Sequence, residues 1–130
     1  MERWLGKISE VFYSLMRMII GVLFACHGAQ KLFGMLGAKS PAADWLMTTA
    51  GIIEFFGGLL VAVGLWTGYA AFLASGQMAV AYFKAHAPQD FWPIVNNGEL
   101  AVLYCFAFLY IASKGPGRLS VAALIKRRRP

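Results

Sequence analysis

Four stretches of mostly apolar residues, separated by short polar segments, divide the chain. They occupy residues 11–33, 47–66, 68–83 and 94–113. A helix of about 20 apolar residues crosses the hydrocarbon core of a bilayer, so each stretch predicts one transmembrane helix. The separators are polar or rich in glycine and proline, with the sequences GMLGAKSPAAD, WTG, KAHAPQDFWP and SKGPGR. The pattern predicts an all-α integral membrane protein, a four-helix bundle that forms one domain over residues 1–130.

Composition agrees with a membrane location. Of the 130 residues, 59% are hydrophobic and only 14% are charged, which is too little polar surface to cover a soluble globule of this size. The net charge of +6 is compatible with nucleic-acid binding, but much of this charge lies in the terminal run KRRR. Anionic lipid headgroups attract such runs by about 1 kcal/mol per residue. We therefore expect the basic tail, residues 114–130, to contact anionic lipids, and we expect no nucleic-acid partner.

The distribution of lysine and arginine predicts the orientation. Basic residues flank the outer ends of the first and fourth stretches, at Arg3, Lys7, Lys114, Arg118 and residues 126–129. Because cytoplasmic segments carry an excess of lysine and arginine, both termini are expected in the cytoplasm. The loops at 34–45 and 84–93 are then expected on the exterior side.

Polar side chains from all four stretches fall in the half that faces the exterior. They are His27, Gln30, Lys31, Glu54, Gln77, Asn97 and Glu99. Glu54 shares a helical face with small residues at 51, 58 and 62, and Gln77 shares one with alanines at 70, 74 and 81. Small residues mark packed helix faces, so both side chains are expected to point into the bundle. Asn96, Glu99 and Leu103 also share a face, which predicts an inward Glu99.

A charge at the membrane centre costs roughly 2.5 to 3.5 kcal/mol, so pairing is expected. Lys31 or His27 would pair with Glu54 or Glu99, and the amide side chains would satisfy the remaining polar atoms. Two interpretations remain open: a structural network that fixes the register of the helices, or a pocket for a polar ligand, a proton or a quinone headgroup. Arg17 lies apart, in the cytoplasmic half of the first stretch, and forms a second polar site.

Metal binding and thiol chemistry are not predicted. The side chains that are able to ligate zinc, iron or manganese here are His27, Glu54, His86 and Glu99. No closely spaced pair such as HxxxH or HExxH occurs, and Lys31 would repel a cation. Cys26 and Cys105 form no CxxC motif, so they are expected to act as small apolar fillers rather than as a catalytic dithiol.

Three segments together resemble a known family. They are RMIIGVLFACHGAQKLFG, GIIEFFGGLLVAVGLWTGYAAFLAS and NNGELAVLYCFAFLYIASKGPGRLSVAAL. In this order they are similar to the DoxX family of small four-helix proteins of the bacterial inner membrane. The similarity covers nearly the whole chain. It rests on Arg17 and on four short motifs: HG..K.FG at 27–34, Glu54 followed by Gly57 and Gly58, NGE at 97–99, and GPGR.S at 115–120. After Ser120 the chain reads VAALIK, where the family often has an aspartate, so no role for that acid is expected here.

The resemblance implies a membrane component of a quinone-linked redox system, because the family is named after a subunit of a thiosulfate:quinone oxidoreductase. It assigns no catalytic residue, and whether the chain is itself an enzyme stays open. A small transporter or exporter and a structural accessory subunit of a larger membrane complex are the alternatives. Gly57 and Gly64 lie seven residues apart and predict contact with a second copy or a partner membrane protein.

Overall fold

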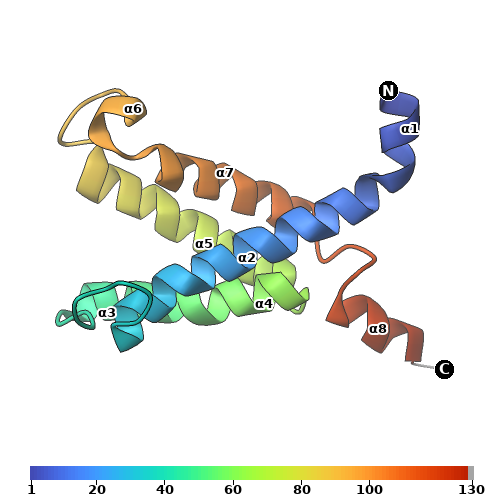
Figure 1. Cartoon of the computed structure of the whole chain (residues 1–130), viewed down its shortest axis with the longest axis horizontal. Coiled ribbons are helices and arrows are strands. Elements are labelled where there is room, and N and C mark those ends of the chain that lie inside the picture. The colour runs from blue at the N-terminus through green and yellow to red at the C-terminus, as the bar shows by residue number, and fades with distance from the viewer. Residues whose placement is uncertain (129–130) are drawn as a thin grey trace.

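The computed structural model describes residues 1–128, and all of its secondary structure is helical (Figure 1). The longer α-helices are α2 (Ser9–Phe33), α3 (Trp45–Ile52), α5 (Thr67–Ala81), α7 (Glu99–Lys114) and α8 (Val121–Arg128). Shorter α-helices are α1 (Glu2–Leu5), α4 (Gly58–Val63) and α6 (Pro93–Asn96). The 3-10 helix η1 (Gly6–Ile8) precedes α2, and two π-helices, η2 (Ile53–Gly57) and η3 (Tyr82–His86), follow α3 and α5. The predicted all-α class is confirmed.

Local sequence signals set the ends of these helices. Gly34 ends α2 in the left-handed conformation, with φ 63°, and donates its N–H to the Gln30 carbonyl at 3.1 Å. Gly64 ends α4 in the same way, with φ 75°. Glycine is favoured in this conformation because it has no Cβ to clash with the backbone. The Asp44 carboxylate caps the first turn of α3 by accepting the Met47 N–H at 3.1 Å.

The helices pack as two pairs. In the first pair, α2 lies along the continuous segment α3–η2–α4, and in the second pair α5 lies along α7 (Figure 1). Glycines bring the backbones of the first pair into contact: a Cβ added to Gly28 would lie 2.2 Å from the Phe55 nitrogen. A Cβ added to Gly58 would lie 2.6 Å from the Ala25 nitrogen. The small residues expected on the packed face of the second stretch are indeed buried.

Aromatic side chains fill the space between the two pairs. The ring of Phe24 in α2 lies 4.6 Å from Phe108 and 5.4 Å from Tyr104, both in α7, measured between ring centroids. Tyr13 and Tyr110 meet edge to face at 6.0 Å. The pairs therefore meet through bulky rings, whereas the helices of the first pair meet backbone to backbone.

Much of the apolar surface is exposed, as contact with lipid requires. Two helical segments, Glu2–Phe33 and Trp45–Val63, are long and apolar enough to cross a membrane. Only 33% and 28% of their most apolar windows are buried, whereas the core helix of a soluble protein is mostly buried. Exposed large apolar side chains also occur on α5 and α7, for example Phe72 and Phe106. Contiguous apolar exposure of this kind marks a surface covered by lipid or another protein.

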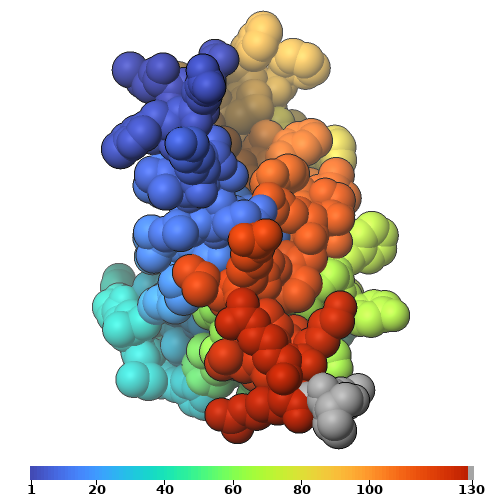
Figure 2. Space-filling model, turned by 90° about the vertical axis from the view of Figure 1, so that its right-hand side faces the viewer, coloured from blue at the N-terminus to red at the C-terminus, as the bar shows by residue number. Residues whose placement is uncertain are grey.

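The two ends of the molecule differ. Both termini and the turn between α4 and α5 lie at one end, here called the terminal end (Figure 1). Figure 2 views that end, with α1 at the upper left and α8 at the bottom. The segments 34–44 and 87–92 lie at the opposite end, here called the loop end, toward which the two helix pairs diverge (Figure 1). The loop end is the half of the molecule in which the sequence predicts the cluster of polar side chains.

One expectation about glycines is corrected. Gly64 was expected to join Gly57 on an oligomer contact face, but Gly64 is buried against this chain's own terminal segment. A Cβ there would lie 2.4 Å from the Ser120 Cβ and 3.1 Å from the Arg17 guanidinium carbon. Gly57 has open space around its Cβ position and remains available for an intermolecular contact.

Candidate functional site

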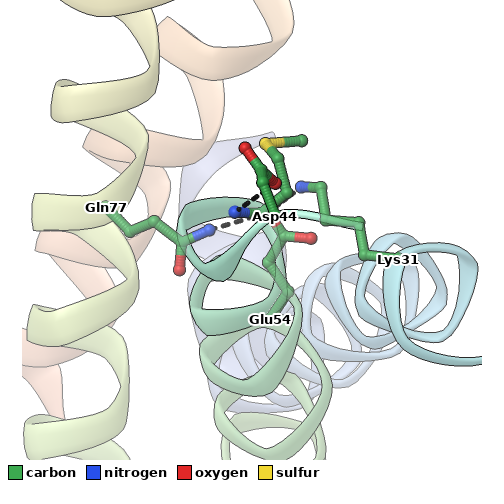
Figure 3. Close-up of polar contacts among 5 residues, drawn as sticks. Lys31, Asp44, Glu54 and Gln77 are labelled. Carbon is green, nitrogen blue, oxygen red and sulfur yellow. Dashed lines mark hydrogen bonds and ion pairs between the residues drawn. The ribbon is translucent and has the colours of Figure 1, made fainter. Parts of the chain in front are cut away.

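A buried ion pair forms the centre of the candidate site. Lys31 of α2 donates to the Glu54 carboxylate of η2, and Glu54 is only 1% exposed. Gln77 of α5 donates its amide N–H to the same carboxylate oxygen, Oε1, at 2.7 Å. Figure 3 shows Lys31 and Gln77 reaching Glu54 from opposite sides. Three helices, one of them from the second pair, thus converge on one carboxylate.

The local backbone makes this convergence possible. Glu54 lies in the π-helix η2, whose wider turn holds one residue more than an α-turn. One turn earlier, Gly51 gives the Lys31 side chain room, because a Cβ at Gly51 would lie 2.9 Å from the Lys31 Cβ. Because α2 and α3 approach closely at Gly51, the Lys31 side chain is near enough to contact Glu54.

Two cavities adjoin the ion pair. The first, of about 250 Å³, is lined by Lys31 and Glu54 together with His27, His86 and Asn97, and by apolar groups that include Phe24, Leu100 and Tyr104. The second, of about 370 Å³, is lined by the same ion pair with Gln77, Lys84 and His86, and by Met47. Lys31, Glu54 and His86 line both cavities. The ion pair therefore borders two cavities.

A larger groove, of about 730 Å³, lies elsewhere between α5 and α7. Its walls are mainly the aromatic and aliphatic side chains of Tyr69, Phe72, Phe106, Leu109 and Tyr110. Among residues 1–128, no lysine, arginine, histidine or carboxylate lines it. A groove with these walls suits lipid chains, and the buried ion pair lies at the two smaller cavities instead.

Hydrogen bonds hold the rim of the first cavity. His86 Nδ1 lies 3.0 Å from the Asn96 carbonyl oxygen, which can only accept, so Nδ1 carries the proton and Nε2 is an acceptor in the neutral ring. The buried Asn96 amide donates to the Asp90 carbonyl at 2.9 Å, and its Oδ1 accepts the Gly98 N–H at 2.8 Å. On the facing helix, the His27 ring packs edge-on against Tyr104, with centroids 6.1 Å apart.

Two buried acceptors near the ion pair have no partner among residues 1–128. They are Glu54 Oε2 and Gln77 Oε1. A buried polar atom without a hydrogen bond costs about 1 to 3 kcal/mol. The site therefore has unused capacity to accept hydrogen bonds.

Comparison with known proteins bears on these residues. The sequence model of the DoxX family matches residues 12–87, more than half of the chain. The chain belongs to the DoxX family. A protein of Haemophilus influenzae named only as uncharacterized is 38% identical over 120 residues, which cover 87% of this chain and 90% of the relative. No solved structure matches the chain. The apolar helices are thus those of a DoxX-family membrane protein, and the relative's name assigns no reaction.

This DoxX protein brings five of the expected polar side chains around the two cavities. Residues His27, Lys31, Glu54 and Asn97 line the first cavity, and Gln77 lines the second and contacts Glu54. Gln30 points elsewhere and donates to the Leu36 carbonyl in the loop after α2, at 2.9 Å.

Glu99 does not join these side chains. It is the first residue of α7, is exposed, and has no hydrogen bond or ion pair with any residue of the described part of the chain. Asn97, with φ 60°, ends α6 in the left-handed conformation, so Asn96 and Glu99 lie in separate helices and share no helical face. Asn96 turns inward, as expected, and Glu99 turns outward.

Two further lining residues had weak signals in the sequence. The sequence indicated His86 only as a possible metal ligand, but the third helix continues through η3 and the His86 ring lines both cavities. Tyr104 was not singled out, although Ala101, Tyr104, Phe108 and Ile111 recur at helical spacing and are all buried.

Arg17 forms a separate, structural site at the terminal end of this DoxX protein. Its guanidinium is fully buried and donates to the carbonyls of Val61, of Ala62 at 2.7 Å and of Leu119 at 2.7 Å. The first two carbonyls belong to the last turn of α4, which carries partial negative charge, and the Val61 carbonyl also accepts the Gly64 N–H at 3.2 Å. Arg17 thus joins α2, the end of α4 and the chain that leads to α8.

Proposed function

We propose that this DoxX protein is a quinone-binding membrane component of a redox system, with its site in the exterior half of the bundle. The observation that carries the proposal is the buried Lys31–Glu54 pair beside a cavity with both polar and apolar walls. A quinone headgroup needs hydrogen-bond donors near the interface, which His27 and Lys31 supply, and an apolar lane, which Phe24 and Leu100 supply. Glu54 is the acid available to exchange protons there.

The size of the first cavity also supports a small ring. Pockets for drug-sized ligands measure about 300 to 1,000 Å³. A cavity of about 250 Å³ suits a single ring and excludes larger fused cofactors. A lipid-soluble tail would extend from the site along the exposed apolar faces of the helices.

A transporter or exporter is less well supported. A transport path would have to continue from the cavities to the terminal end of the molecule. Phe24, Val61, Phe108 and Ile111, each at most 1% exposed, fill that part of the core. An accessory subunit remains compatible with the exposed apolar faces and with a homo-oligomer that uses Gly57.

The proposal includes a topology: a four-helix, multi-pass protein of the bacterial inner membrane with both termini in the cytoplasm. Support comes from the basic residues at the terminal end and from the common position of the two termini (Figure 1). In a background without Cys26 and Cys105, cysteines placed at the exposed Lys39 or Gln89 should react with an impermeant thiol reagent added to intact cells. Cysteines at either terminus should react only after lysis, and the opposite result would reverse the orientation.

Stability measurements test whether the ion pair acts as a unit. Breaking one partner of a buried pair costs about 3 to 5 kcal/mol, so Lys31→Met and Glu54→Gln should each lower the unfolding free energy by this order. The double variant should cost clearly less than the sum of the two singles. The matched control is the exposed Lys114–Glu10 pair, 2.8 Å between charged atoms, for which single variants should change the unfolding free energy far less because water screens the pair.

Ligand binding tests the function itself. A short-chain quinone should raise the melting temperature of the parent protein and of the Lys114→Met/Glu10→Gln control. It should leave the Lys31→Met/Glu54→Gln variant unchanged. If the stability measurements show coupling between Lys31 and Glu54 while no quinone raises the melting temperature of the parent protein, the ion pair only fixes the register of the helices. The redox proposal then fails.

A further inference from the structure

We propose that this site prefers the reduced, hydroxyl-bearing form of the quinone over the oxidised form, because a hydroxyl can donate to the free acceptors beside the ion pair. This inference rests on the proposed function and adds which redox form the site recognises. A quinone ring carries two carbonyl oxygens, which only accept hydrogen bonds. The hydroquinone carries two hydroxyls, each of which donates one hydrogen bond and also accepts.

The donors at the centre of the site already serve the protein. Lys31 and the Gln77 amide both donate to Glu54 Oε1. His86 directs its Nδ1 proton to the Asn96 carbonyl, and the Asn96 amide donates to the Asp90 carbonyl. Each of these contacts uses one donor, and Lys31 keeps two further protons that can reach a ligand.

Several hydrogen-bond acceptors beside the ion pair are unused. Within residues 1–128, Glu54 Oε2 and Gln77 Oε1 are buried and have no partner, and the neutral His86 ring has an acceptor at Nε2. Glu54 lines both cavities, and its carboxylate uses one of its two oxygens. Rotation about the last side-chain torsion, which has a broad two-fold profile, turns either oxygen toward a ligand.

A quinone carbonyl placed there could accept a proton from Lys31 but would leave Glu54 Oε2 without a donor. A hydroquinone hydroxyl there would donate to Glu54 and at the same time accept from one of the remaining Lys31 protons. Hydrogen bonds to an ionised carboxylate are the stronger kind, and leaving such an acceptor buried and unpaired is costly. The site is therefore matched to the reduced ring.

Equilibrium dialysis under argon tests this preference. Full-length protein in nanodiscs would be dialysed against duroquinone, and separately against durohydroquinone with a reductant that is also present in a blank. We expect durohydroquinone to bind at least about tenfold more tightly, the effect of one buried hydrogen bond to a charged group. The Lys31→Met/Glu54→Gln variant should bind both forms only weakly and without the preference, because its new amide adds a donor. The Lys114→Met/Glu10→Gln control should keep the preference.

The outcomes separate this inference from the proposed function. Equal binding of the two forms, or tighter binding of duroquinone, overturns the inference and leaves a quinone site in place. A preference that survives in the Lys31→Met/Glu54→Gln variant also overturns it, because Glu54 would then not be the acceptor. If neither form binds the parent protein, the proposed function fails together with the inference.

Discussion

Alanine at position 28 is expected to lower the unfolding free energy by at least about 3 kcal/mol, the upper range of overpacking effects. The added Cβ would lie 2.2 Å from the Phe55 nitrogen, 2.6 Å from the Phe55 Cα and 2.7 Å from the Gly51 carbonyl oxygen. All three are backbone atoms, so no side chain can rotate away and α2 must separate from α3 and η2. Unfolding in SDS and the melting temperature in a mild detergent measure this loss.

Gly76 provides the matched control for this substitution. It also lies within a helix, α5, but nothing is found within 4 Å of its Cβ position. Gly76→Ala should leave the unfolding free energy unchanged or raise it by up to about 1 kcal/mol through helix propensity. Equal melting temperatures for the two alanine variants would contradict the close backbone contact between α2 and η2.

Replacing Arg17 by methionine should cost about 3 to 5 kcal/mol, the range for breaking a buried polar network. The variant keeps the unbranched stem of the side chain but removes the donor to the Ala62 and Leu119 carbonyls, and it leaves the Val61 carbonyl with the Gly64 N–H at 3.2 Å. Two contributions to the unfolding free energy oppose each other. The loss of hydrogen bonds destabilises the variant, whereas the removal of a buried charge stabilises it. The loss of hydrogen bonds should win, since each unsatisfied carbonyl costs about 1 to 3 kcal/mol.

A second readout separates Arg17 from a general packing defect. Because the guanidinium also binds the Leu119 carbonyl, Arg17→Met should free the chain before α8 and speed tryptic cleavage after Arg118 in inside-out vesicles. Lysine at position 17 should restore only part of the protection, because an ammonium cannot reproduce the planar fork of the guanidinium. Met at the exposed position 118 is the stability control. Unchanged stability and cleavage in Arg17→Met would remove the structural role.

The inward positions of Glu54 and Gln77, and a cationic partner for a buried acid, could be predicted from the sequence because two simple rules apply there. The choice between Lys31 and His27, and between Glu54 and Glu99, stayed open. Helical spacing puts Glu54 and Gln77 on faces lined by small residues, and the cost of an unpaired charge in the membrane favours a partner. Both rules hold as long as the helix is continuous up to the residue concerned. Glu54 and Gln77 meet that condition, since each follows an uninterrupted run of helix.

Glu99 and His86 show where the same rules fail. The left-handed Asn97 divides the fourth stretch, so the spacing from Asn96 to Glu99 does not describe one helix. His86 lies in a π-helix three residues beyond the predicted end at 83, where the wider turn changes the direction of the side chain. Neither a left-handed asparagine nor a π-turn leaves a periodic signal, because each interrupts the helical repeat at a single place.

The divergence of the two helix pairs toward the loop end has a mechanical consequence. At the terminal end the pairs are fastened together by Arg17, by the Tyr13 hydroxyl on the Gly115 carbonyl and by the Lys114–Glu10 pair. At the loop end, the Gln77–Glu54 hydrogen bond is the polar link between them in the described chain. The terminal end can therefore act as a hinge. A small rotation of one helix pair against the other about this hinge displaces the loop end most. The width of the two cavities is therefore the dimension of this protein that is most sensitive to bending.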